Sequence, residues 1–210
     1  MKTTIISLLF AVCLFGDANA QTTSNNFTRY QLASGWSLEI PESWKATKTF
    51  NQDMSELIQA GSDSATKKVL GSSAGKVDTQ LMAFKNLFGQ KIALTVSILH
   101  TKNSYTQDQL ASLSEDEINK FTNIVFQGAG KSLVDAGCDP KSRLLVDIRK
   151  YDKNIVLNSH LNEPPDGRVT LTSQIMNGNQ ALQLTFIYKQ SSEEVWDPFI
   201  NRILESVIVP

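Results

Sequence analysis

The alternation of apolar and polar residues near the end of the chain predicts an antiparallel strand pair followed by a helix. The strands are expected at Arg168 to Met176 and at Asn179 to Lys189, because Asn177-Gly178 between them tolerates the positive φ angles of a tight type I′ turn. A final segment, Ser191 to Val207, has apolar residues at helical spacing and can cover the sheet. Within it, Asp197-Pro198 indicates a break, with the main helix starting at the proline. The second strand presents a large apolar row to one face: Leu182, Leu184, Phe186 and Tyr188.

Similar patterns earlier in the chain predict further antiparallel pairs. Two short strands around Gly35 end at Pro41, since proline cannot donate to a strand ladder. A second pair is expected at Gln80 to Lys85 and Lys91 to His100, joined by five residues that include Gly89, and a third at Arg143 to Tyr151 and Asn154 to Leu161 around Asp152-Lys153. The fold class predicted from these patterns is α+β, with a single antiparallel sheet of about six to seven strands and helices packed on it.

A long helix is predicted from Thr106 to Ala136. Thr106 with Gln109, and Ser114 with Glu117, have the spacing of capping boxes. Gly137 can end the helix as a left-handed cap. One side carries an apolar stripe that is expected to face the sheet: Ile118, Phe121, Val125, Ala129 and Leu133.

The stretch from Asn51 to Lys76 gives a weaker pattern. Asp53 to Ala60 can form a helix with apolar residues on one side. Gly61 to Lys76 is rich in glycine, serine and lysine, a composition that favours a mobile loop. The role of the whole 51–76 region stays open.

The first twenty residues are interpreted as a secretory signal peptide. Lys2 supplies the positive start, Ile5 to Phe15 the apolar core, and Ala18-Asn19-Ala20 the small residues of a cleavage site. Cleavage is predicted after Ala20, which makes the protein periplasmic or secreted. Removing these 20 residues from a chain of 210 leaves 190, enough for one domain. We expect residues 21–26 to be disordered, residues 27–210 to form that domain, and no transmembrane segment after cleavage.

The net charge argues against a nucleic-acid partner, and the cysteine content argues against an internal disulfide. The formal net charge of −1 is unchanged by cleavage, which removes Lys2 and Asp17, so there is no net attraction to nucleic acid. Cys13 leaves with the signal and Cys138 remains alone, so the mature chain forms no internal disulfide. Cys138 is then either a buried small apolar residue or a possible reactive thiol.

No motif for catalysis, cofactor binding or metal binding is complete, and we therefore expect no enzyme and no cofactor. Gly128 to Ser132 ends like a phosphate-binding loop, but that loop requires a glycine where this chain has Val125. His100 and His160 each lie at the end of a predicted strand without the spacing of metal ligands. Glu115 to Glu117 is interpreted as a favourable charge at a helix start.

The run Gly35-Trp36-Ser37-Leu38-Glu39-Ile40-Pro41-Glu42-Ser43-Trp44 resembles the first hairpin of the Mog1/PsbP-like superfamily. The other end is similar too, with a long strand at Leu182 to Lys189 and a helical segment at Phe199 to Ser206. This resemblance implies an α/β/α sandwich. It also implies a non-enzymatic binding or assembly factor that contacts another protein through a sheet edge, a hairpin end or a sheet face.

Three functions follow as hypotheses. The first is this exported domain, with another envelope or secreted protein as its partner. The second is a small-molecule or lipid-binding protein in which Gly61 to Lys76 closes over an apolar cleft between sheet and helix. The third is a secreted hydrolase with His100 or His160 as base and a serine or Cys138 as nucleophile.

Overall fold

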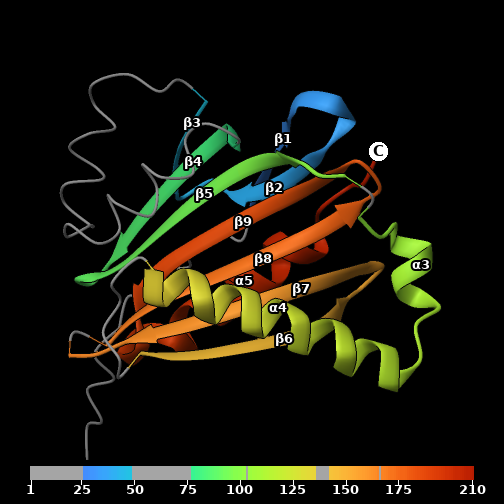
Figure 1. The fold of residues 1–210 in the computed structure, drawn as a ribbon. Helices are drawn as coiled ribbons and strands as arrows, with labels where there is room; N and C mark the ends of the chain where they lie inside the picture. Colours follow the sequence, from blue (N-terminus) through green and yellow to red (C-terminus); the bar gives the residue numbers. More distant parts are fainter. Residues whose placement is uncertain (1–25, 49–76, 103, 136–141, 166) are drawn as a thin grey trace, which may run out of the picture.

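A seven-stranded antiparallel sheet forms the centre of the structure (Figure 1). The computed structural model describes residues 26–48, 77–102, 104–135, 142–165 and 167–210. The expected signal peptide, the 51–76 region and Cys138 lie outside these residues. In spatial order the strands are β3 (Lys45–Thr47), β4 (Val77–Leu87), β5 (Gln90–His100), β9 (Gln180–Lys189), β8 (Arg168–Asn177), β7 (Asn154–Glu163) and β6 (Arg143–Tyr151).

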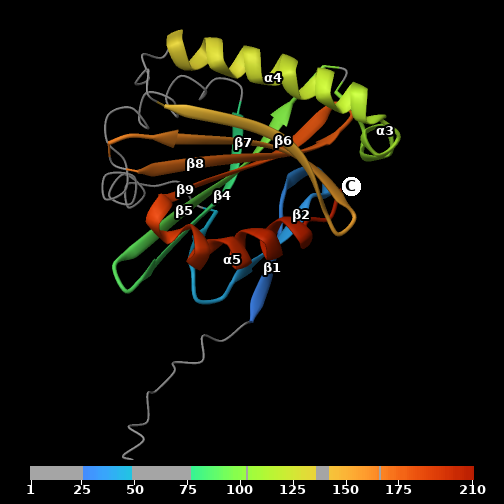
Figure 2. The ribbon, with the colours of Figure 1, turned by 90° about the horizontal axis from the view of Figure 1, so that it is seen from below.

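The two faces of the sheet carry different elements (Figure 2). One face is covered by helix α5 (Glu193–Glu205), which follows the short 3-10 turn Gln190–Ser192, and by the two-stranded ribbon β1 (Phe27–Gln31) and β2 (Ser37–Pro41), joined through the 3-10 turn Ala33–Gly35. The other face carries α3 (Gln107–Ala111) and α4 (Glu115–Asp135). The architecture is therefore an α/β/α sandwich, and the expected α+β class is confirmed.

The main hydrophobic core lies between the sheet and α5. The predicted apolar row of β9 faces this side, and it pairs in register with the apolar row of β5, so that Leu94 lies opposite Phe186. From α5, Trp196 and Ile203 are fully buried against these rows. Each large apolar side chain buried in this way contributes about 2 kcal/mol. The face is consequently closed around a dense core.

The core on the α3 and α4 side is smaller. Its buried members are Leu110, Leu157, Met176 and Ala181. Within the described residues, α4 packs mainly along β6 at one edge of the sheet (Figure 1). This helix therefore shapes an edge of the sandwich.

Four local predictions were wrong. The type I′ turn expected at Asn177-Gly178 does not form, because Asn177 pairs with Gln180, the turn is Gly178-Asn179, and of these residues only Gly178 has positive φ. The helix predicted over Thr106 to Ala136 is two helices, because each capping box starts its own: Thr106 and Gln109 cap α3, and Ser114 bonds Glu117 at the start of α4. The expected five-residue connection between β4 and β5 is a two-residue turn, Phe88-Gly89, with longer strands on both sides. Both turn residues have positive φ, which phenylalanine seldom adopts.

Helix α5 also differs from its prediction, since it runs through Pro198 without the expected break. Trp196 and Ile200, which lie two residues before and two residues after the proline, are both buried in the core. Their packing holds the helix continuous although proline supplies no backbone donor.

Within the described residues, the structure contains no helix with the length and apolar character that crossing a membrane requires.

Candidate functional site

Strand β6 is the last strand of the sheet, and among the described residues no strand pairs with its outer side. Tyr151 and Asn154 flank the two-residue turn between β6 and β7, so they form a hydrogen-bonded pair. Because such pairs alternate along an antiparallel ladder, the N–H and C=O groups of every second residue point outward. The register assigns the outward positions to Leu144, Val146, Ile148 and Lys150.

Helix α4 is positioned beside this edge by its own sequence. Ser114 and Glu117 cap its start, with the Ser114 backbone N–H donating to Glu117 Oε2 at 2.8 Å. Hydrogen bonds from the Ser114 side chain and backbone lower the pKa of Glu117. Phe121 and Val125, from the predicted apolar stripe, turn toward the sheet. Phe126 is one position further around the helix, and this places its ring at the flank of the contact.

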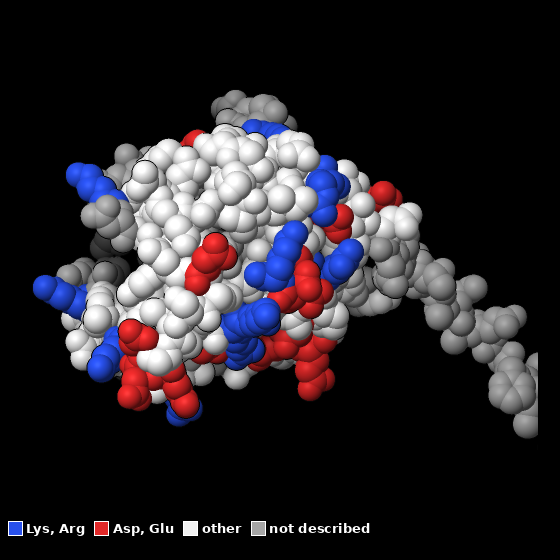
Figure 3. Space-filling model, turned by 90° about the vertical axis from the view of Figure 1, so that its right-hand side faces the viewer, with Lys and Arg blue, Asp and Glu red and all other residues white. Residues whose placement is uncertain are grey.

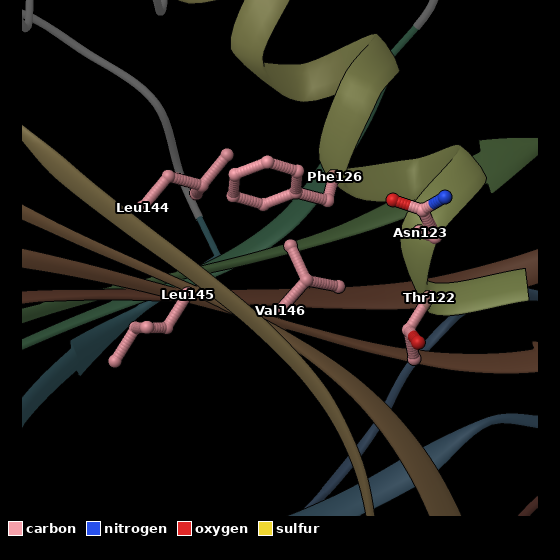
Figure 4. Close-up of a pocket in the computed structure, with 6 residues that line it drawn as sticks. All are labelled: Thr122, Asn123, Phe126, Leu144, Leu145 and Val146. Atoms are coloured by element: carbon pink, nitrogen blue, oxygen red, sulfur yellow. The ribbon is translucent and has the colours of Figure 1, made fainter. Parts of the chain in front are cut away.

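A groove of about 290 Å³ runs between α4 and β6 (Figure 4). Figure 4 shows Leu144 and Val146 on the same side of the strand as Phe126, whereas Leu145 points to the opposite side. Phe126 is 45% exposed and Leu145 is 67% exposed. Apolar side chains therefore lie open to solvent on both sides of the unpaired edge. The residues that line the groove are Thr122, Asn123, Phe126, Leu144, Leu145 and Val146.

The charges on β6 are mostly positive, with Arg143, Arg149 and Lys150 against one carboxylate, Asp147. Arg149 Nε donates to Asp147 Oδ2 at 2.9 Å, and this hydrogen bond raises the pKa of Arg149. The other oxygen, Asp147 Oδ1, accepts from Asn158 Nδ2 at 3.0 Å. Asp147 is thus held by two partners. Because β6 carries three cations and this single carboxylate, the strand has an excess of positive charge.

The two histidines considered as bases for hydrolysis lie far apart. His100 ends β5 and His160 lies within β7, three strands away. The register separates them by roughly 25 Å, at about 4.8 Å per strand and 3.3 Å per residue. His160 Nε2 has no hydrogen-bond partner in the described residues and lies 3.8 Å from Glu193 Oε1. Cys138 lies outside the described residues.

The surroundings of His160 form an acidic cluster at the start of α5. Glu193 and Asp197 lie near Tyr188, whose ring is 3% exposed. Burial raises the pKa of Tyr188, and the two carboxylates raise it further. Loss of solvation likewise raises the pKa of Asp197, against the opposing effect of His160. Negative charge in the first turn of a helix is favourable, and this explains Glu193 at the start of α5.

The remaining motifs give no ion or nucleotide site. No group of His, Cys, Asp and Glu side chains in the described residues could hold a metal ion. Gly128 and Gly130 lie inside α4, where a phosphate-binding loop cannot form.

On the side of the molecule seen in Figure 3, positive and negative side chains are intermixed. That face offers no large field of one sign for a charged polymer.

The sheet face beneath α4, where an apolar ligand was considered, carries polar side chains in its middle. Gln174 donates to Gln183 at 2.9 Å, and Thr172 lies opposite Thr185. Such hydroxyl and amide groups in the middle of the face do not make an apolar lining.

The groove was missed by the sequence analysis. A usable signal existed, because Leu144, Leu145 and Val146 are three consecutive apolar residues in a strand and therefore place apolar side chains on both faces. What the pattern lacked was the position of the strand at the edge of the sheet.

The antiparallel sheet, with α5 and the N-terminal β1–β2 ribbon on one face, defines a Mog1/PsbP-like fold. The cyanobacterial PsbP (CyanoP) of Synechocystis sp. PCC 6803 has a similar solution structure, with a TM-score of 0.51 and 12% sequence identity over 89% of this chain and 94% of that one. A crystal structure from Bacteroides thetaiotaomicron VPI-5482 aligns with a TM-score of 0.42 and 9% identity, over 87% of this chain and 48% of that one. No protein-family model and no curated protein matches the sequence. At these identities the likeness concerns the fold.

Proposed function

We propose that this protein is an exported, non-enzymatic binding or assembly-factor domain that holds another envelope or secreted protein. The contact surface is the outer edge of β6 together with the groove beside α4. We call this surface the β6–α4 edge.

The observation that carries the proposal is the exposure of apolar side chains beside backbone groups that no described strand pairs with. Leu145 and Phe126 keep much of their surface in water, at a cost that a partner would remove. An unpaired strand edge offers a row of hydrogen-bond donors and acceptors, and proteins commonly use such edges to bind other chains. The fold supports this role because the Mog1/PsbP-like resemblance implies binding factors.

Export is part of the proposal and rests on the pattern of residues 1–20. It is tested by expressing the full chain in a bacterium, separating the periplasmic fraction, and determining the N-terminus of the protein by mass spectrometry. A chain beginning at Gln21 in that fraction supports export. An uncleaved chain retained in the cytoplasm contradicts it.

The binding surface is tested by capture from an envelope extract with purified protein and two single variants of α4. Phe126→Ser removes an aromatic ring from the groove, whereas Ile124→Ser removes an exposed apolar side chain that does not line it. Ile124 is 68% exposed, so both variants are expected to fold. We expect a partner that is captured by the wild type and by Ile124→Ser but lost with Phe126→Ser.

Equal capture by both variants would place the contact elsewhere and reject the β6–α4 edge. Absence of any specifically captured protein, in an extract of the cells that naturally make this chain, would reject the binding function.

A further inference from the structure

We propose that the partner binds β6 as an added antiparallel strand whose side chains are apolar toward the groove and acidic opposite Arg143 and Arg149. This inference rests on the proposed function and specifies the chemistry of its partner. Its three supports are the backbone of β6, the two faces of the edge, and the charge of the strand.

The backbone of β6 is suited to receive a strand. Its pairing with β7 is regular from Arg143 to Tyr151, without a bulge that would twist the edge away. The strand contains no proline, so every outward position keeps its N–H group. The four alternate residues whose backbone groups point outward can therefore exchange hydrogen bonds with an added strand: Leu144, Val146, Ile148 and Lys150. An antiparallel strand would continue the pairing direction of the whole sheet.

The two faces of the edge impose different side chains on such a strand. Side chains that follow the row of Leu144 and Val146 would enter the groove against Phe126. They must be apolar to gain from burial there. Side chains on the opposite face would lie beside Arg143, Leu145, Asp147 and Arg149. Asp147 is already bound by Arg149 and Asn158. The preferred strand therefore alternates between an apolar face and a face that carries acidic residues.

Charge distinguishes this partner from a second copy of the chain. Three cations and one carboxylate lie on β6, and a second β6 would bring the same excess of positive charge. In a two-fold antiparallel pairing centred on Asp147, that carboxylate would also face its own copy, and like charges directly opposite are destabilising. A strand with acidic side chains would instead place negative charges beside the cations of β6. A strand of another protein is thus favoured over self-association.

The probe is an acetylated peptide amide with the order Glu-Glu-Val-Thr-Val-Val-Ile-Glu, designed to lie antiparallel so that its fifth residue pairs with Val146. Two versions of the peptide carry one N-methyl group each, on the fifth residue or on the sixth. Both sites are valine, so the versions have the same composition and charge. Only the methyl group on the fifth residue would replace an N–H directed at β6.

Binding to the full-length mature protein is measured by fluorescence anisotropy, with a fluorescent label in place of the N-terminal acetyl group of each peptide. We expect the sixth-residue version to bind within about threefold of the parent peptide, and the fifth-residue version to bind at least about tenfold more weakly. A version with each Glu replaced by Lys is expected to lose at least as much affinity.

The protein side is tested with two variants. Val146→Pro removes an outward N–H that no strand of the described sheet uses, at an edge position where proline is tolerated. Ile124→Ser, the control, changes an exposed side chain of α4 that does not line the groove. We expect Val146→Pro to lose the peptide and Ile124→Ser to bind within about threefold of wild type.

The outcomes separate the two proposals. Equal affinity of the two N-methyl peptides, or no binding of the parent peptide, overturns strand addition even if capture depends on Phe126. Binding of the Lys version as tightly as the Glu version overturns the acidic partner. A dimer of the free protein that Val146→Pro dissociates overturns it in favour of a second copy. The proposed contact surface fails separately, when capture does not depend on Phe126, and the binding function fails when no protein is specifically captured.

Discussion

Asn154, the first residue of β7, donates from Nδ2 to the backbone carbonyl of Leu204 near the end of α5, at 3.1 Å. The same amide donates to the carbonyl of Val207 at 2.9 Å. Asn154 is 1% exposed, so both bonds are shielded from water. One side chain thus ties the hairpin of the edge strand to the C-terminal end of the helix on the opposite face of β6 from the groove.

We predict that Asn154→Ala lowers the free energy of unfolding by about 2 kcal/mol, because two buried hydrogen bonds to the carbonyl groups of Leu204 and Val207 are lost. Denaturant unfolding followed by circular dichroism measures this loss. Asn162→Ala is the control, since its amide bonds Gln190 at an exposed position and its loss is expected to stay within about 0.5 kcal/mol. Similar losses in both variants would contradict the importance of burial.

Phe88 is predicted to be a site of backbone strain that can be relieved. Its φ angle is 50°, and its side chain is 89% exposed, so the ring contributes little packing. Phe88→Asn is expected to raise the free energy of unfolding by about 1 kcal/mol, since asparagine tolerates this conformation. Phe88→Ala removes the ring but keeps the strain, and we expect its thermal midpoint to match the wild type. A loss of stability in Phe88→Asn would show that the ring is needed.

Tyr188 should make the fold sensitive to alkali. Its pKa is raised in the folded state, so the unfolded chain releases the phenolic proton first as the pH passes about 10. The free energy of unfolding therefore falls as the pH rises further. Tyr188→Phe removes this proton, and its alkaline unfolding midpoint is expected to lie at higher pH. Tyr105→Phe, at a partly exposed ring, is the control and should leave the midpoint unchanged.

Trp44 and Trp196 are expected to stabilise each other. Their rings meet edge to face, with centroids 6.1 Å apart. A double-mutant cycle with Trp44→Leu and Trp196→Leu should give a coupling of about 1 kcal/mol, measured by denaturant unfolding. The pair Trp44→Leu and Asn162→Ala provides the additive reference. A coupling near zero would show that the two tryptophans stabilise the fold only through the burial of each ring.

The sequence allowed the sheet to be predicted where local chemistry determines it. Asn177-Gly178 predicted the last hairpin, and β8 and β9 do pair, although the turn lies one residue later than expected, at Gly178-Asn179. The capping residues Ser114 and Glu117 likewise make the contact that their spacing indicates, although the single helix predicted through them is divided there. At these places a few neighbouring residues determine the local backbone, which is why the pattern succeeds.

The failures occurred where distant residues decide the structure. Pro198 indicated a helix break, but burial of Trp196 and Ile200 keeps α5 continuous. Phe88 gave no turn signal, because the hairpin is imposed by the pairing of β4 with β5. The β6–α4 edge depends on strand order, and strand order is not encoded in the residues of β6 themselves.

The order of strands along the chain also bears on how the protein folds. β6, β7, β8 and β9 are consecutive in sequence and each pairs with the next, so this half of the sheet closes through short connections. Pairing of β5 with β9 joins Ile92 to Tyr188 across most of the second half of the chain, which has a larger entropic cost. We expect the four-strand meander to gain protection in pulsed hydrogen exchange before β4 and β5 join it. The nascent meander would then expose both β6 and β9 as open edges, and the late arrival of β5 would leave β6 as the one edge of this meander that a partner can still reach.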